Sequence, residues 1–179
     1  MSEPALHASA QSVHSKLAVG LCTYKRRESL ERTLEHIGLA ARQLAQAPDV
    51  IVVDNDGHDE AVSRSVQTFA AASGLKVHYR IEPQPGISAA RNAVFDMAEG
   101  LGTRFLAMID DDEWPSEMWL KSLLAAQHAS GAAVVGAPVR PVFPDSANGL
   151  RRHARFWSVE RQLLRGRPFV FCTCNFLID

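Results

Sequence analysis

The acidic run at residues 110–113 is the strongest chemical signal in this sequence. It consists of Asp110, Asp111, Asp112 and Glu113, and it directly follows the apolar residues 104–109 (RFLAMI). Adjacent carboxylates repel one another, so an apolar strand that brings them to one edge of a sheet needs a positive charge there. Mg²⁺ and Mn²⁺ prefer oxygen ligands and take one or two carboxylates together with substrate phosphates. Because Asp110 and Asp112 are two residues apart in an extended segment, they are the candidate metal ligands.

Acidic runs also occur where no ligand binds. In a solvated turn, the same side chains would cap the helix that the sequence predicts from Ser116, because carboxylates accept hydrogen bonds from the free N–H groups of a helix start. Taken by itself, the run leaves both the metal site and the solvated acidic turn open.

Asp54 and Tyr24 each stand in a loop that follows an apolar run. Asp54 comes after residues 50–53 (VIVV), and its carboxylate can accept hydrogen bonds from the ring edge of uracil or guanine. Tyr24 comes shortly after residues 17–22 (LAVGLC), and its ring can contact the same base. Alternatively, Asp54 holds its own turn, residues 54–57, through the backbone. Neither residue alone distinguishes a binding site from a turn.

Residues 85–92 (PGISAARN) form a third candidate segment. Gly86 gives a turn conformational freedom, and Ser88 can begin a helix. Arg91 can pair with a phosphate group or with a carboxylate of the site. Alternatively, the alanines of the segment are simply small residues that let a helix pack closely, so the segment is informative only in combination with the other two.

Alternating strands and helices must position these residues. Apolar runs predict strands at residues 17–22, 50–53, 104–109 and 132–139, and a further strand is predicted around residues 76–81. Apolar residues at three- and four-residue steps predict helices from Glu28 to before Pro48 and at residues 60–73, 87–99 and 118–130. This order predicts an α/β fold with a mainly parallel sheet and helices on both faces. Ligands bind beyond the carboxyl ends of such strands, so the loops after residues 22, 53 and 109 should converge on one site.

Composition narrows the class of protein further. The chain has 179 residues, of which 46% are hydrophobic and 22% are charged, which is the size and content of one globular domain. With a net charge of −1 there is no basic excess, so we expect no nucleic-acid partner. The three cysteines, Cys22, Cys172 and Cys174, lack paired spacing, so we expect a cytoplasmic location and no disulfide. No stretch approaches the roughly 18 apolar residues that span a bilayer.

Taken together, the motifs resemble those of family 2 glycosyltransferases with the GT-A fold. The matching pieces are residues 22–26 (CTYKR), 52–55 (VVDN), 86–92 (GISAARN) and 109–113 (IDDDE), followed by Pro115. Their order and spacing also match the family, across residues 17–139. This combination favours the metal site over the solvated turn for the acidic run.

The resemblance implies a Rossmann-like GT-A fold and an enzyme that transfers sugar with inversion. The implied donor is a nucleoside-diphosphate sugar, the implied cofactor is a divalent cation, Mg²⁺ or Mn²⁺, and the implied acceptor is a hydroxyl group of a glycan or lipid-linked molecule. By the same resemblance, the setting is surface polysaccharide or glycan synthesis.

The resemblance also assigns roles to individual residues. It predicts nucleotide-sugar binding by Thr23, Tyr24, Asp54, Arg91, Asp110 and Asp111. Among these, Asp54 is expected to read the base beside Tyr24, and Arg91 to support the diphosphate. Asp110 and Asp111 are expected near the ribose and the sugar. Asp112 is the expected metal ligand, with Asp110 as a second carboxylate.

The sequence departs from the family's pattern in two places. Lys25 stands where the family commonly has Asn. The general base of the family lies well downstream in an acidic motif that nothing here matches, so we expect the base beyond Asp179 and a truncated chain that binds donor without transferring sugar. We accordingly divide the chain into a flexible tail (residues 1–15), a nucleotide-sugar-binding core (16–140) and the start of an incomplete acceptor-side region (141–179).

Residues 151–167 combine six arginines with one acidic residue and with interleaved apolar side chains. We favour a solvated basic helix whose aromatic side chains join a hydrophobic core. The alternatives are a helix that lies on anionic lipid at the inner face of the membrane, or a patch for a lipid-phosphate acceptor.

Two other functions are alternatives to sugar transfer. A sugar nucleotidyltransferase would favour a glycine-rich phosphate loop after the first strand, and residues 23–27 (TYKRR) contain no glycine. A non-catalytic nucleotide- or metal-binding module would use the same residues and would need no base. Sugar transfer from UDP-, GDP- or dTDP-sugars separates an enzyme from such a module.

Overall fold

The computed structural model describes residues 16–56, 60–142, 162–164, 167–169 and 174–179, so the predicted tail at residues 1–15 lies outside the described part. Its first part alternates strands and helices, namely β1 (Leu17–Thr23), α1 (Arg27–Ala41), β2 (Asp49–Asp54), α2 (Glu60–Ser73), β3 (Val77–Ile81), α3 (Ile87–Gly100), β4 (Phe105–Met108) and α4 (Trp119–Ser130). Four short strands follow, namely β5 (Val134–Gly136), β6 (Gln162–Leu164), β7 (Arg167–Phe169) and β8 (Phe176–Ile178). The predicted alternation of strands and helices is confirmed.

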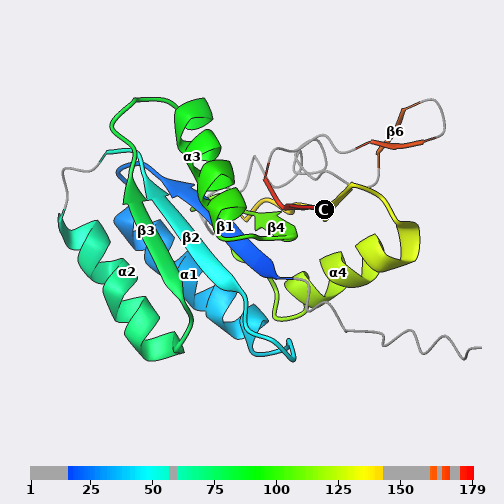
Figure 1. The fold of residues 1–179 in the computed structure, drawn as a ribbon, viewed down its shortest axis with the longest axis horizontal. Coiled ribbons are helices and arrows are strands. Elements are labelled where there is room, and N and C mark those ends of the chain that lie inside the picture. The colour runs from blue at the N-terminus through cyan, green and yellow to red at the C-terminus, as the bar shows by residue number, and fades with distance from the viewer. Residues whose placement is uncertain (1–15, 57–59, 143–161, 165–166, 170–173) are drawn as a thin grey trace, which may run out of the picture.

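Six strands form one sheet in the order β3-β2-β1-β4-β8-β5 (Figure 1). β1 pairs in parallel with β2 and β4, and β2 pairs in parallel with β3. β8 runs antiparallel to both of its neighbours, β4 and β5. β6 and β7 form a separate antiparallel pair. The sheet is therefore mainly parallel, as predicted, with one reversed strand.

Strand β8 joins the sheet from the part of the chain beyond residue 140. Its Leu177 is fully buried and pairs with Ala107 of β4 on one side and with Val135 of β5 on the other. In the fold, β8 therefore belongs to the core sheet. The division at residue 140 into a donor part and an acceptor part concerns function and stays a prediction.

Helices cover both faces of the sheet, with α3 on the opposite side from α1 and α2 (Figure 1). On one face, α1, α2 and α4 pack against strand residues such as Val50 and Val52. On the other face, Ala90 and Val94 of α3 pack against the intervening residues, such as Ile51. Successive side chains of a strand point to opposite faces, so a strand covered on both sides is apolar throughout.

Helix α3 lies close to β1 because Gly20 has no side chain. A Cβ atom at Gly20 would collide with Val94 of α3 and would lie 2.9 Å from Sδ of Met108, closer than real Cβ contacts. Small buried residues of α3, such as Ala90, contribute to the same close packing. This packing holds the start of α3, which carries Arg91, near the carboxyl ends of the strands.

Two predicted elements are shorter than the sequence indicated. Helix α1 ends at Ala41 instead of continuing toward Pro48, because the N–H groups of Gln43 and Leu44 bond back only three residues and tighten the chain into a turn. Strand β5 covers Val134–Gly136 instead of residues 132–139, and Pro138, which has no N–H group to donate, follows its end.

The helix predicted over residues 151–167 is wrong in the part that the structure describes. There, Gln162–Leu164 is strand β6, and Arg167 begins its antiparallel partner β7. The rest of the segment, with its predicted membrane or acceptor contact, lies outside the described residues. Among the helices that the structure describes, none combines the length and the apolar character of a membrane span.

Candidate functional site

The loops after β1, β2 and β4 meet at one edge of the sheet, as predicted. Parallel pairing places Thr23 at the end of β1 beside Asp54 at the end of β2. A cavity of about 650 Å³ opens between these loops and the start of α3. Its lining includes Thr23, Tyr24, Arg26, Asn55, Arg91, Asp110, Asp111 and Asp112. The structure therefore brings six of the seven predicted site residues to one cavity, and Asp54 is the exception.

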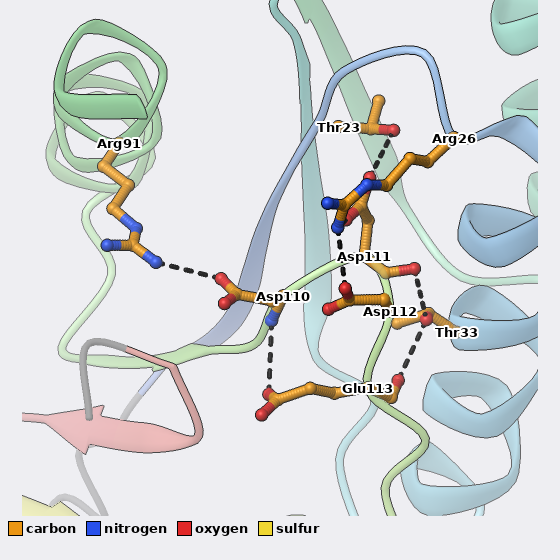
Figure 2. A network of polar contacts seen from close by, with 8 residues as sticks. All are labelled: Thr23, Arg26, Thr33, Arg91, Asp110, Asp111, Asp112 and Glu113. Carbon is orange, nitrogen blue, oxygen red and sulfur yellow. Dashed lines mark hydrogen bonds and ion pairs between the residues drawn. The ribbon is translucent and has the colours of Figure 1, made fainter. Parts of the chain in front are cut away.

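The two outer aspartates of the acidic run each pair with an arginine from a different part of the fold (Figure 2). Asp110 accepts a hydrogen bond from Arg91 of α3 at 2.9 Å, and Asp112 accepts one from Arg26, just before α1, at 2.7 Å. The Asp112 side chain is 52% exposed and that of Asp110 is 39% exposed. Two cations of the chain itself therefore supply the positive charge that the acidic run needs.

The middle aspartate, Asp111, turns into the floor of the cavity. It is 6% exposed, and its Oδ2 accepts a hydrogen bond from the hydroxyl of Thr23 at 2.8 Å. Burial raises the pKa of Asp111, while the hydrogen bond from Thr23 and the charge of Arg26 act to lower it. Asp111 thus joins the loop after β4 to the end of β1 and separates the two outward-facing carboxylates.

Asp54 is buried behind the cavity instead of lining it. It is 1% exposed, and its two oxygens accept hydrogen bonds from the hydroxyl of Tyr79 at 2.8 Å and from the N–H of Asp56 at 2.9 Å. The second contact is the turn-holding role that the sequence left open for this residue. Its predicted contact with a base stays a prediction.

Asn55 and Arg26 line the cavity, although the sequence analysis assigned neither of them a role. Asn55 accepts a hydrogen bond from the N–H of Gly86 at 2.9 Å and donates two to main-chain oxygens of the loop before it. It therefore ties the end of β2 to the start of α3. Both residues stand inside the matched motifs at residues 22–26 and 52–55, which was the available signal for them.

Helix α1 holds the backbone of the acidic loop. The hydroxyl of Thr33, which is fully buried, contacts the carbonyl oxygens of Asp111 and Glu113 at 2.9 Å each (Figure 2). One turn along, Nδ1 of His36 lies 3.0 Å from the carbonyl oxygen of Pro115. These contacts set the direction in which each carboxylate of the loop points.

Two further groups beside the site, Glu113 and Cys22, have raised pKa values. Burial raises the pKa of Glu113, while hydrogen bonds from the thiol of Cys174 and from the N–H of Asp110 act to lower it. Burial also raises the pKa of the Cys22 thiol to about 12, with the charge of Arg91 acting in the opposite direction. Cys22 lines the cavity as a protonated thiol at neutral pH and is therefore a poor nucleophile.

The donor set of the cavity fits a hard divalent cation that also binds phosphate. Asp112 presents an exposed carboxylate, and Asp110 lines the same cavity. Among the described residues, no group of three His, Cys, Asp or Glu side chains forms a closed metal cage. Mg²⁺ bound with substrate phosphates needs only one or two carboxylates, so an open site of this kind suits it better than a cage.

Comparison with known proteins identifies the family. The sequence model of Glycosyl transferase family 2 matches residues 18–178. The succinoglycan biosynthesis protein ExoM of Rhizobium meliloti (strain 1021) is 34% identical over 162 residues, which cover 89% of this chain and 50% of ExoM. The glycosyltransferase AglE of Haloferax volcanii is 26% identical over 130 residues, which cover 73% of this chain and 41% of AglE. The chain spans half or less of the length of these curated relatives.

Solved structures show the same fold. The mannosyltransferase PcManGT from Pyrobaculum calidifontis, in complex with GDP-Man and Mn²⁺, is similar with a TM-score of 0.59 at 19% identity, over 70% of this chain and 36% of that one. Residues 1–349 of S. aureus TarS are similar with a TM-score of 0.55 at 19% identity, over 72% of this chain and 38% of that one. These structures confirm the predicted GT-A fold. Because the family model matches residues 18–178 of the 179 residues, this chain belongs to glycosyl transferase family 2.

Proposed function

We propose that the protein transfers a sugar from a nucleoside-diphosphate sugar to a hydroxyl group of a glycan or lipid-linked acceptor. The observation that carries the proposal is a cavity at the carboxyl ends of parallel strands in which Arg26 and Arg91 flank three aspartates. Family membership supports transfer of a sugar. The name of ExoM supports a setting in polysaccharide synthesis.

A divalent cation and the diphosphate of the donor share the acidic side of this cavity in our proposal. Asp112 would hold Mg²⁺ or Mn²⁺, with Asp110 as the second carboxylate, and the ion would supply positive charge to the leaving diphosphate. The Mn²⁺ and GDP-Man named with PcManGT support this pairing. Arg91 would contact the diphosphate, because a guanidinium group donates hydrogen bonds in directions that match phosphate oxygens.

The nucleoside would occupy the side of the cavity formed by the loops after β1 and β2. Tyr24 lines this side and is 52% exposed, so its ring is available for contact with the base. Asp54 would reach the edge of the base from behind the lining, and Asp110 and Asp111 would lie near the ribose and the sugar. Thr23 lines the same cavity and would contribute to binding of the nucleotide-sugar. We propose inverting transfer, and the protonated thiol of Cys22 supports a route without a covalent intermediate on that side chain.

Asp112→Ala tests the cation site. Calorimetry with Mn²⁺ and UDP or GDP should show metal-dependent binding by the unaltered chain and its loss in the variant, because the ion and the phosphates lose their shared carboxylate. Asp96→Ala is the matched control, since Asp96 is an exposed aspartate of α3 outside the cavity lining. Equal metal-dependent affinity in Asp112→Ala and the control would contradict the assignment.

Catalysis needs a separate assay, because binding of a donor does not by itself show transfer of the sugar. Sugar transfer and donor hydrolysis should be measured with UDP-, GDP- and dTDP-sugars, and the Asp112→Ala variant should lose both. A protein that binds these donors with Mn²⁺ but neither transfers nor hydrolyses them would be a non-catalytic nucleotide-binding module. That outcome would reject our proposal of an enzyme while leaving the cation site in place.

A further inference from the structure

Arg26 occupies the place on Asp112 where our proposed function puts a divalent cation. Its Nη1 lies 2.7 Å from Oδ2 of Asp112 and 3.4 Å from Oδ1 of Asp111 (Figure 2). One nitrogen of the guanidinium therefore bridges two carboxylates. A divalent cation held by Asp112 would lie close to this guanidinium, and the two positive charges would repel each other.

The backbone directs Arg26 toward the acidic run. Lys25, the residue before it, has a φ of 56°, in the left-handed region that most residues avoid. This conformation turns the chain sharply between β1 and α1, and Arg26 is the last residue before that helix begins. The turn thus brings Arg26 to residues that are 85 and 86 positions later in the chain.

The ion pair between Arg26 and Asp112 is exposed to solvent and can dissociate at low cost. The Arg26 side chain is 57% exposed and that of Asp112 is 52% exposed, and ion pairs with this exposure contribute little to folding stability. The pair between Arg91 and Asp110 is more enclosed, since the Arg91 side chain is only 20% exposed. Arg26 can therefore leave its carboxylate at low cost, whereas Arg91 is held in the wall of the cavity.

We propose that Arg26 is a counter-ion that exchanges partners when the donor binds. Without donor, Arg26 neutralises Asp112 and competes with the divalent cation for it. When the cation and the nucleoside diphosphate enter together, Asp112 passes to the cation and Arg26 turns to the diphosphate. This inference rests on the proposed function, because it assumes a cation at Asp112.

The exchange couples cation binding to diphosphate binding. A diphosphate that draws Arg26 away from Asp112 removes the competitor of the cation, so each ligand strengthens the binding of the other. The coupling disfavours a cation bound without donor. A fixed structural ion pair would contribute no such coupling, because it would stay closed in both states.

Charge removal at Arg26 tests the exchange. Arg26→Gln should bind Mn²⁺ about two- to fivefold more tightly than the unaltered chain when no nucleotide is present, because the competing cation is gone. The same variant should bind UDP or GDP about tenfold more weakly in the presence of Mn²⁺, because it lacks the guanidinium contact. Calorimetry and the electron paramagnetic resonance signal of free Mn²⁺ measure both affinities without any turnover.

Lys25→Gln is the matched control, because it removes the same charge from the adjacent residue, whose ammonium pairs with Asp56 and not with the acidic run. It should leave Mn²⁺ affinity near that of the unaltered chain, and Arg26→Lys, which keeps the charge, should do the same. Equal or weaker Mn²⁺ binding by Arg26→Gln, with Asp112→Ala still abolishing the metal response, would overturn the exchange alone. Absence of Mn²⁺-dependent nucleotide binding in every variant and in the unaltered chain would overturn the cation site and the exchange together.

Discussion

The hydroxyl of Thr23 donates a hydrogen bond of 2.8 Å to the carboxylate of Asp111, 88 residues later in the chain. Both residues are buried, so this contact gives the middle aspartate of the run an interior partner. With Asp111 held inward, Asp110 and Asp112 on either side of it face the two arginines of the cavity. The directions of the three aspartate side chains therefore depend on this buried hydrogen bond as well as on the ion pairs at the surface of the cavity.

Removal of the Thr23 hydroxyl should destabilise the fold. Thr23→Val keeps the shape of the side chain but leaves the buried carboxylate of Asp111 without this donor, which should lower the free energy of unfolding by about 1–3 kcal/mol. Urea unfolding measures the change. Thr23→Ser keeps a hydroxyl and should retain most of the stability, so equal losses in the two variants would contradict the role of the hydrogen bond.

Thr33 should act as a positioning residue for the acidic loop. Thr33→Val removes the hydroxyl that contacts two carbonyl oxygens of the loop, so the carboxylates should lose their fixed directions and Mn²⁺-dependent nucleotide affinity should fall about tenfold. Thr33→Ser should restore the affinity. Thr68→Val, which makes the same substitution at an exposed residue of α2 that contacts a carbonyl oxygen of its own helix, serves as the control for the substitution itself. An affinity loss that Thr33→Ser does not restore would argue against positioning.

Asp54 should affect nucleotide affinity without changing its dependence on metal. Asp54→Ala should weaken binding by about 1–3 kcal/mol if the carboxylate contacts the base. Tyr79→Phe removes the phenolic hydroxyl that donates to Asp54 but keeps the carboxylate, so it isolates the structural contribution. Calorimetry with and without Mn²⁺ separates the two roles. If both variants lost stability and neither lost affinity, Asp54 would be a structural residue only.

The stability that Asp49 contributes should disappear in acid. Burial acts to raise the pKa of the Asp49 carboxyl, but hydrogen bonds from His78 and Lys16 outweigh it and the pKa is lowered. A lowered pKa in the folded state means stability that is present above the ordinary pKa of about 3.9 and is lost as the pH falls through the folded value.

Asp49→Asn should therefore be less stable than the unaltered chain by about 1 kcal/mol near neutral pH, and the difference should shrink below about pH 4. Unfolding by urea at several pH values measures it. Asp96→Asn, at an exposed aspartate of α3, is the control for the substitution itself. A gap between Asp49→Asn and the unaltered chain that stayed constant with pH would show that the charge of Asp49 is not responsible.

Gly20→Ala should loosen the contact between α3 and β1. The added Cβ would collide with Val94 and approach Met108, and such overpacking costs about 1–3 kcal/mol. Gly100→Ala, at the end of the same helix with open space around it, should be neutral or slightly stabilising. Val94→Ala should partly rescue Gly20→Ala, and failure of this rescue would locate the strain elsewhere. Thermal unfolding of the three variants measures the effect.

The sequence by itself determined the layers of the fold and the edge at which the site forms. Runs such as residues 50–53 are apolar throughout because both faces of the strand are covered, and this pattern is visible in the sequence itself. The rule that ligands lie beyond the carboxyl ends of parallel strands then placed the loops with Tyr24 and Asp112 together, and the cavity confirms that convergence. The sequence motifs, such as residues 109–113, also indicated the glycosyltransferase family.

Only the tertiary structure decided which arginine pairs with which aspartate in the cavity. The partners Arg26 and Asp112 are 86 residues apart, and the inward turn of Asp111 depends on a helix, α1, that contacts the loop from the side. No local pattern encodes such contacts, because the direction of a side chain in a loop follows from how the surrounding elements pack. The antiparallel insertion of β8 between β4 and β5 was unpredictable for the same reason. A three-residue apolar strand fits many positions in a sheet, and its neighbours in space, distant in sequence, select the one that it takes.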